Sequence, residues 1–518
     1  MMSFETVRNE EKTMLRRLAS LSLALVVAAG AISACEGGSQ SGPRPEDFTY
    51  EPLDFTPPSP DEFRTELSNG LIVYIAEDHE IPWVDASLMV RTGPFLEPDN
   101  KIGVASLTSR IMREGGTTSM TGEEITERMD FLAGSVSATN LSIHTRYLDE
   151  GLDIWMDILT NPAFPEDKLR RNKESALVAF ENRNKNVSTV GRRAFSELVY
   201  GDDSPINAEQ TEGIINGIQR GDLFAWHGMY WGANNTILVV AGDFDRAEML
   251  QKLEETFGQW GDAEEAVPAI PEVTQAADAG VYMIEPEVIP NQGVIQIGHL
   301  GLMEDHPDYA AVDLMNYILG GGSFSSRITK IVRSDNGLAY STGSRFSGGT
   351  LFPGTFTASC QTKNSTVVFA AQLMLNEIER IRNEAVPAED LEFARTARVN
   401  AFPALFGGGG RSGAMFGTLR NFADLEFNNR PMDYFDTYVQ RYEAVTVEDI
   451  QRVAREYLRP ENMIIMISGN IAESRAGADN MLPNQATIDE MAALFGGRTM
   501  EGLAEKYGEG TVHIMELR

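Results

Sequence analysis

The chain has 518 residues, more than one ordinary hydrophobic core organises, so two or more domains are expected. Hydrophobic residues make up 42% and charged residues 23%, a globular balance that argues against disorder for most of the chain. The formal net charge is −33 and no basic patch stands out, which argues against a nucleic-acid partner. An acidic surface suits either solubility or the attraction of basic peptides. Two cysteines, Cys35 and Cys360, are too few for a disulfide framework or a structural zinc site.

The N-terminal segment, residues 1–34, has the pattern of a secretory signal. Arg16 and Arg17 precede a short apolar run, and small residues follow as far as Ala34. An apolar run this short, flanked in this way, predicts a cleaved signal peptide and not a membrane span. Met14 is an alternative start, because an acidic leader before such a signal is unusual.

A lipid anchor is the expected outcome of this signal. Ile32-Ser33-Ala34-Cys35 resembles a bacterial lipobox, which implies that Cys35 carries acyl chains and begins the mature protein. Glu36 after the cysteine favours the outer membrane, facing the periplasm. The alternative is an ordinary cleaved signal with an incidental cysteine. Residues 35–61, rich in Gly, Ser, Pro and acidic residues, predict a tether.

The remaining chain repeats itself. Residues 222–230 and 235–242 predict a helix, a turn and a buried strand, and residues 449–457 and 462–469 repeat that pattern at a constant offset. The segments beginning at Gly70 and Gly280 also match, and each leads to an Ile-Pro pair. An alternating strand follows in each copy, Val84–Arg91 and Val294–His299, and then a helix.

These repeats predict an α+β fold with two homologous domains, each an antiparallel sheet with helices packed on one face. The expected boundaries are 62–262 for the first domain, 263–278 for the linker and 279–471 for the second domain. The C-terminal extension, 472–518, contains one expected helix near Ile488–Phe495 and a short strand near Thr511–Met515.

The first helix of the first domain carries the most specific pattern, Gly103-Val-Ala-Ser-Leu-Thr-Ser-Arg-Ile-Met-Arg-Glu-Gly-Gly-Thr117. In this frame the segment resembles the zinc helix of the pitrilysin/insulinase family, whose active members carry His-x-x-Glu-His. Ser106 stands at the first histidine, Ser109 at the glutamate that acts as general base, and Arg110 at the second histidine. The resemblance covers residues 64–470 and implies a fold that forms half of a clamshell chamber.

These replacements remove the zinc chemistry. Two histidines four residues apart grip zinc from one helix face, whereas serine is a poor ligand and a protonated arginine repels the ion. The six histidines (residues 79, 144, 227, 299, 306 and 513) include no pair three to five residues apart. The family's third ligand corresponds to Glu181, which follows Glu174 by seven residues. We expect no metal in this chain and a salt bridge between Arg110 and Glu181 in place of the ion; two solvated side chains are the alternative.

The second domain retains a different constellation. Arg333 and Tyr340 lie seven residues apart in Val332-Arg-Ser-Asp-Asn-Gly-Leu-Ala-Tyr340, after a Gly-rich turn. By resemblance, the arginine holds a bound peptide and the tyrosine hydroxyl donates to the developing oxyanion. Such a donor contributes about 3 kcal/mol to transition-state stabilisation.

Two glycine runs and one strand are candidates for further binding elements. Gly320, Gly321, Gly322 and Ser323 are expected to shape a turn beside the substrate; no Lys-Ser/Thr follows, which argues against a nucleotide loop. Gly407–Gly410 is expected to be a hinge or loop. In the family, a strand at the place of Val84–Arg91 pairs through its edge with the bound peptide.

A chain without the zinc motif and with the arginine/tyrosine pair resembles the non-zinc subunit of the family's heteromeric peptidases. This implies no cofactor in this chain, zinc in a homologous partner subunit, and unfolded peptides as substrates. The alternatives are an inert binding or scaffold protein of the same fold and an independent hydrolase. Ser106 and Ser109 have no nearby His and Asp in sequence to support the latter.

Overall fold

The computed structural model describes residues 55–518 except 266, 269–271, 408–410, 412 and 477–484. The predicted signal, most of the tether and Cys35 therefore lie outside the described residues. Residues 56–518 form one compact unit. None of the helices in the described part combines the length and apolarity that a bilayer crossing requires.

The first repeat contains the strands β1 (Arg64–Glu66), β2 (Ile72–Glu77), β3 (Trp83–Val90), β4 (Ser135–Val136), β5 (Asn140–His144) and β6 (Thr236–Gly242). Its helices are α2 (Val104–Gly115), α3 (Gly122–Phe131), α4 (Leu148–Thr160), α5 (Glu166–Asn182), α6 (Val187–Tyr200), α7 (Glu212–Gly217), α8 (Arg220–Tyr230) and α9 (Arg246–Phe257).

The second repeat and the extension contain β7 (Gly280–Ile284), β8 (Gln292–Leu300), β9 (Leu302–Met303), β10 (Thr342–Phe346), β11 (Gly348–Gly349), β12 (Thr355–Lys363), β13 (Ile464–Ser468) and β14 (Val512–Ile514). The helices are α10 (Tyr309–Asn316), α11 (Arg327–Thr329), α12 (Val367–Asn383), α13 (Ala388–Ala401), α14 (Ala414–Phe427), α15 (Tyr438–Glu443), α16 (Val447–Tyr457), α17 (Ile471–Ala476), α18 (Gln485–Leu494) and α19 (Met500–Tyr507).

The predicted repeat is confirmed by strand order. The first sheet runs β1-β2-β6-β3-β5-β4 and the second β14-β7-β13-β8-β12-β10, so five strands of each sheet occupy equivalent places. The outermost strands differ, because β1 pairs antiparallel with β2 and β14 pairs in parallel with β7. Most pairs are antiparallel, as expected, but β2 pairs with β6 and β7 with β13 in parallel. The parallel pair follows from the long helical crossover that brings the last strand of each repeat back beside its first.

The strand expected to offer its edge to a peptide does not lie at the edge of its sheet. β3, the strand of Val84–Arg91, pairs on one side with β6 and on the other with β5, so it is internal and offers no edge to a peptide. Its alternating apolar and polar pattern is typical of a half-buried strand, yet Asp85 and Ser87 are also buried. Arg420 of α14 explains the burial of Ser87, because its Nη1 donates to the Ser87 hydroxyl at 2.7 Å.

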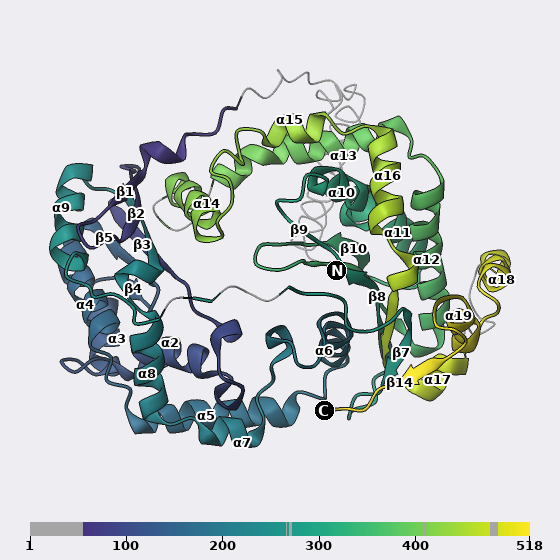
Figure 1. Ribbon diagram of the computed structural model, residues 1–518, viewed down its shortest axis with the longest axis horizontal. Coiled ribbons are helices and arrows are strands. Elements are labelled where there is room, and N and C mark those ends of the chain that lie inside the picture. Colours follow the sequence, from purple (N-terminus) through teal and green to yellow (C-terminus); the bar gives the residue numbers. More distant parts are fainter. Residues whose placement is uncertain (1–54, 266, 269–271, 408–410, 412, 477–484) are drawn as a thin grey trace, which may run out of the picture. The chain divides into compact units, whose positions relative to one another are not determined.

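Each sheet has its own hydrophobic core on the face covered by the helices of its own repeat. The opposite face receives one helix from the other repeat: α6 packs on β8 and β13, and α14 packs on β2 and β6 (Figure 1). Gly191 allows α6 to approach β13 closely, since a Cβ there would lie 3.1 Å from the Ser468 Cβ. This exchange of helices joins the two repeats into one compact unit.

The C-terminal extension completes the second sheet. The expected helix and strand are confirmed as α18 and β14, and α17 and α19 are additional. Strand β14 pairs in parallel with β7 and covers what would otherwise be an edge. Met515 and Leu517 then pack beside α6, and the Asn184 side-chain amide donates to the Arg518 carbonyl at 2.9 Å.

Candidate functional site

Helix α2 holds the three positions where zinc chemistry would lie. The Glu97 carboxylate caps its N-terminus by accepting from the backbone N–H groups of Gly103 and Ala105, both at 2.8 Å. Ser106 is exposed, and its hydroxyl donates to the Gly103 carbonyl at 3.1 Å. Ser109 is half-buried and Arg110 is exposed. The helix predicted from the motif is therefore confirmed.

The expected salt bridge between Arg110 and Glu181 is not formed. Arg110 donates from Nη1 to the Asn172 side-chain oxygen of α5 at 3.4 Å. Glu181 lies nine residues further along α5, which corresponds to about 13 Å of helix rise. Within the described residues neither Arg110 nor Glu181 belongs to an ion pair. The exposed face of α5 explains this outcome, because water solvates Glu181 there.

The residues on α2 do not fit a zinc ion. Across the described residues, no group of three His, Cys, Asp or Glu side chains could hold a metal. Ser106 supplies only a weak neutral donor, and Arg110 brings a positive charge to the place of the second ligand. No step of a reaction can therefore be assigned to a metal bound here.

Restoring the histidine pair tests how much of the metal site α5 still provides. We expect the variant with Ser106→His and Arg110→His to bind Zn²⁺, because both positions are exposed and one helical turn apart. At about 100 times Kd, the free energy of unfolding should rise by about 2.7 kcal/mol, measured by denaturation with zinc and with a chelator. Ser106→His alone is the control and should show no rise. An equal response after adding Glu181→Gln would contradict a ligand role for Glu181.

Arg333 and Tyr340, the pair predicted in the second domain, lie in contact with each other. The Arg333 guanidinium carbon lies 4.6 Å from the centroid of the Tyr340 ring. Tyr340 is 84% exposed, the highest fraction among the exposed large hydrophobic side chains. No hydrogen bond of its hydroxyl is present among the described residues. The ring is thus held by Arg333 while its hydroxyl is open to a ligand.

A third residue, which the sequence motif did not indicate, lies beside Arg333. Phe324, in the short 3₁₀ turn Ser323–Ser325, lies on Arg333 as well, with 4.4 Å between the guanidinium carbon and the ring centroid. The signal was present in the sequence, since an aromatic residue directly follows the Gly-rich turn. Its contact with Arg333 could not be read from spacing alone.

The Gly-rich turn has a packing role that explains its composition. A Cβ on Gly320 would lie 2.3 Å from the Ser344 backbone nitrogen of β10. Ser323 has a φ of +58°, which non-glycine residues rarely adopt, and it directly precedes Phe324. The turn predicted beside Arg333 and Tyr340 is therefore packed against β10 and carries Phe324 to the pair.

The mutation Gly320→Ala should displace this turn. We expect a loss of about 2 kcal/mol in the free energy of unfolding, because the added methyl overlaps the backbone of β10 and neither side can move freely. The measurement is urea denaturation. Gly221→Ala in α8 is the matched control, since nothing lies within 4 Å of its Cβ position. Equal stability of the two variants would contradict the packing role.

The edge of the second sheet beside this pair is already covered. Side chains of Thr329, Asn316 and Tyr309 donate to the carbonyls of Thr342, Ser344 and Phe346 at 3.1, 3.4 and 3.5 Å. A peptide strand added at β10 would have to displace these donors. Ligand binding at this place therefore depends on side chains.

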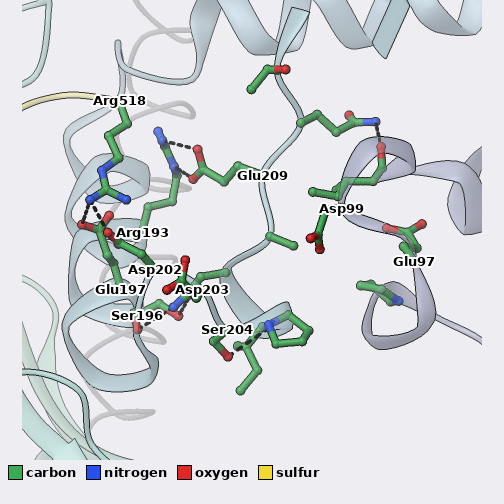
Figure 2. Close-up of a pocket in the computed structure, with 18 of the residues that line it drawn as sticks. Glu97, Asp99, Arg193, Ser196, Glu197, Asp202, Asp203, Ser204, Glu209 and Arg518 are labelled. Atoms are coloured by element: carbon green, nitrogen blue, oxygen red, sulfur yellow. Dashed lines mark hydrogen bonds and ion pairs between the residues drawn. The ribbon is translucent and has the colours of Figure 1, made fainter. Parts of the chain in front are cut away.

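A charged cavity of about 910 Å³ lies between α6 and the segment of residues 94–102. Figure 2 shows Glu97 and Asp99 on one side and Arg193, Glu197 and Arg518 on the other. Arg193 pairs with Glu209, with 2.7 Å between Nη2 and Oε2, and Arg518 pairs with Glu197 at 3.2 Å. Both of these arginines are paired within the wall, and none of the residues predicted for the site lines the cavity.

Cys360 offers no nucleophile. It is buried in the second core, and burial raises the pKa of its thiol to about 12. The thiol is therefore protonated and inert at neutral pH.

Two family profiles match the chain. "Insulinase (Peptidase family M16)" matches residues 72–204, and "Peptidase M16 inactive domain" matches residues 217–398, so together they cover more than half of the chain. The protein belongs to the M16 peptidase family, to which the insulinase-like resemblance of the sequence pointed.

The relatives carry mixed descriptions. The chain is 25% identical to an uncharacterized zinc protease of Rickettsia bellii, over 64% of this chain and 81% of that protein. It is 21% identical to the non-peptidase homolog YmxG of Helicobacter pylori, over 77% and 91%. A solved peptidase M16 inactive domain from Pseudomonas fluorescens has a TM-score of 0.67 at 24% identity, covering 78% of this chain and 97% of that one.

Proposed function

We propose that this protein is a catalytically inert M16 subunit that binds unfolded peptides and acts with a homologous subunit carrying the zinc motif. One observation carries the proposal. The metal positions Ser106 and Arg110 cannot hold zinc, whereas Arg333 and Tyr340 remain exposed, in contact and without a polar partner within the described residues. In this division of work, the partner supplies the zinc-activated water, and this chain supplies substrate contacts.

The names of the relatives support the inert half of this proposal, since one is a non-peptidase homolog and one profile describes an inactive domain. The partner role rests on the retained pair. A scaffold that never touches substrate gives no reason to expose Tyr340. We further propose that acylated Cys35 anchors the protein at the bacterial outer membrane, facing the periplasm, which labelling with a radioactive fatty acid tests.

The experiment compares peptide hydrolysis by the full-length protein, by a His-x-x-Glu-His homologue from the same organism, and by their mixture. We expect cleavage by the mixture alone. If the homologue alone cleaves at the same rate, this chain is a scaffold or a separate binding protein. Cleavage by this chain alone, insensitive to a chelator, would instead indicate an independent hydrolase.

A further inference from the structure

Arg333 contacts two exposed aromatic rings. Its guanidinium carbon is 4.4 Å from the centroid of Phe324, which is 64% exposed, and 4.6 Å from that of Tyr340. No hydrogen bond from the Arg333 guanidinium to another described residue is present, so its N–H donors are available to a ligand. Among the described residues no carboxylate lies within 4 Å of Arg333. The chain thus holds a cation in place without supplying its anion.

Several other arginines that lie on rings in this protein find an acceptor within the chain, which is a backbone carbonyl for Arg220 and Arg441 and a carboxylate in the two cases that follow. Arg398 stacks on Tyr317 and pairs with Asp313 at 2.6 Å. Arg430 stacks on Tyr434 and pairs with Glu304 at 3.3 Å. In both, a ring covers one face of the guanidinium, and a carboxylate accepts from its edge. Arg333 has two rings and no carboxylate.

We propose that Arg333, Phe324 and Tyr340 form a site for a peptide carboxylate. A planar guanidinium binds a carboxylate with two parallel hydrogen bonds, and the contacts with the two rings restrict the movement of the Arg333 side chain. The Gly-rich turn contributes by fixing Phe324. The proposal rests on the peptide-binding function above and names its substrate class: extended peptides with a carboxylate placed at Arg333.

Long-range attraction cannot account for such a preference. The net charge of −33 repels acidic peptides, so a preference for a carboxylate must arise from local contact. At 0.15 M salt the screening length is about 8 Å, and direct contact survives while the general repulsion weakens. The preference should therefore persist at physiological salt.

The carboxylate has two sources, the C-terminus of a peptide and an Asp or Glu side chain. Four versions of one unstructured, fluorescently labelled peptide separate them: a free C-terminus or an amide, each with an internal Glu or Gln. Anisotropy titration of the full-length protein gives Kd for each version. We expect the version with both carboxylates replaced to bind about tenfold more weakly, since one good contact of this kind is worth about 1.4 kcal/mol. The single replacements identify the source.

Three variants test the residues. Arg333→Gln and Phe324→Ala should remove the difference between peptides, and Arg333→Lys should retain little of it, because an ammonium lacks the planar fork. Arg345→Gln is the matched control: Arg345 is an exposed arginine on β10 without a ring contact in the described residues, and this variant should behave as the wild type. Circular dichroism of each variant verifies folding.

The outcomes separate this proposal from the function on which it rests. Equal binding of all four peptides, still weakened by Tyr340→Ala, overturns the carboxylate site and leaves peptide binding intact. No binding of any peptide by any form overturns both. A preference that persists in Arg333→Gln also overturns the proposal, because the carboxylate is then bound elsewhere.

Discussion

Replacing Tyr340 with phenylalanine is expected to lower kcat of the mixed enzyme about 100-fold and to leave KM close to the wild-type value. The change removes one oxygen atom. The ring remains, and with it the contact with Arg333 at 4.6 Å. Since the hydroxyl has no other hydrogen bond within the described residues, its loss leaves no buried polar group unpaired, and stability should not change.

The split between kcat and KM decides the role of the hydroxyl. A donor that strengthens only as charge develops on the substrate lowers kcat when it is removed, whereas a donor that binds the substrate throughout raises KM. Steady-state kinetics of the mixture give both constants. A rise in KM at constant kcat would assign Tyr340 to substrate binding and contradict a contact made in the transition state.

Tyr282→Phe is the matched control for this experiment. Tyr282 is also a tyrosine of the second sheet, but its hydroxyl donates to the Asp278 carbonyl at 3.0 Å within its own segment. It should change kcat less than about twofold, since the change removes one local hydrogen bond of a half-buried tyrosine and keeps its ring. If both variants lose activity equally, the effect of Tyr340→Phe reflects general damage to the mixed enzyme.

The parts of the fold that depend on local pattern could be predicted from the sequence. Residues 222–242 and 449–469 repeat a helix, a turn and a strand, and the structure has α8 with β6 and α16 with β13 in those places. Arg333 and Tyr340 could be selected as candidate site residues from a family motif, but their contact with each other was not predicted. Hydrophobic periodicity and turn residues determine elements of this kind within about 20 residues.

Long-range pairings could not be predicted in the same way. The central position of β3 depends on β6, which returns after the helices and inserts between β2 and β3. Burial of Ser87 depends on α14, more than 300 residues later in the chain. The failed salt bridge has a similar cause: Arg110 and Glu181 lie on packed helices, but the axial offset between them is set by tertiary packing.

The packing of α14 on the first sheet leads to a second prediction, which concerns stability. Glu426 of α14 accepts from Arg64 Nη2 of β1 at 2.8 Å and from the Tyr74 hydroxyl of β2 at 2.7 Å. We expect Glu426→Ala to lower the free energy of unfolding by about 3 kcal/mol, because a half-buried guanidinium and a buried hydroxyl lose their acceptor. The value is at the low end for buried pairs, since Arg64 keeps 35% of its side chain exposed.

The same contact predicts a dependence on pH. Burial opposes ionisation of Glu426, but the hydrogen bonds from Arg64 and Tyr74 outweigh it and hold the pKa of this carboxyl below its ordinary value. A group whose pKa is lower in the folded state stabilises the fold above its ordinary pKa, about 4.5, and loses that contribution as the pH falls below it. The difference in stability between wild type and Glu426→Ala should therefore shrink on acidification below about pH 4.5.

Urea denaturation at pH 7 and at pH 3.5 measures both effects. Glu174→Ala is the control, because it removes the exposed pair between Arg170 and Glu174, whose side chains are 61% and 59% exposed. An exposed pair of this kind contributes about 0.5 kcal/mol. If Glu426→Ala costs no more than this control, α14 is not anchored to the first sheet through its carboxylate. The apolar contact of Phe422 with Phe63, at 6.1 Å between ring centroids, would then be the attachment that joins the two repeats on that side.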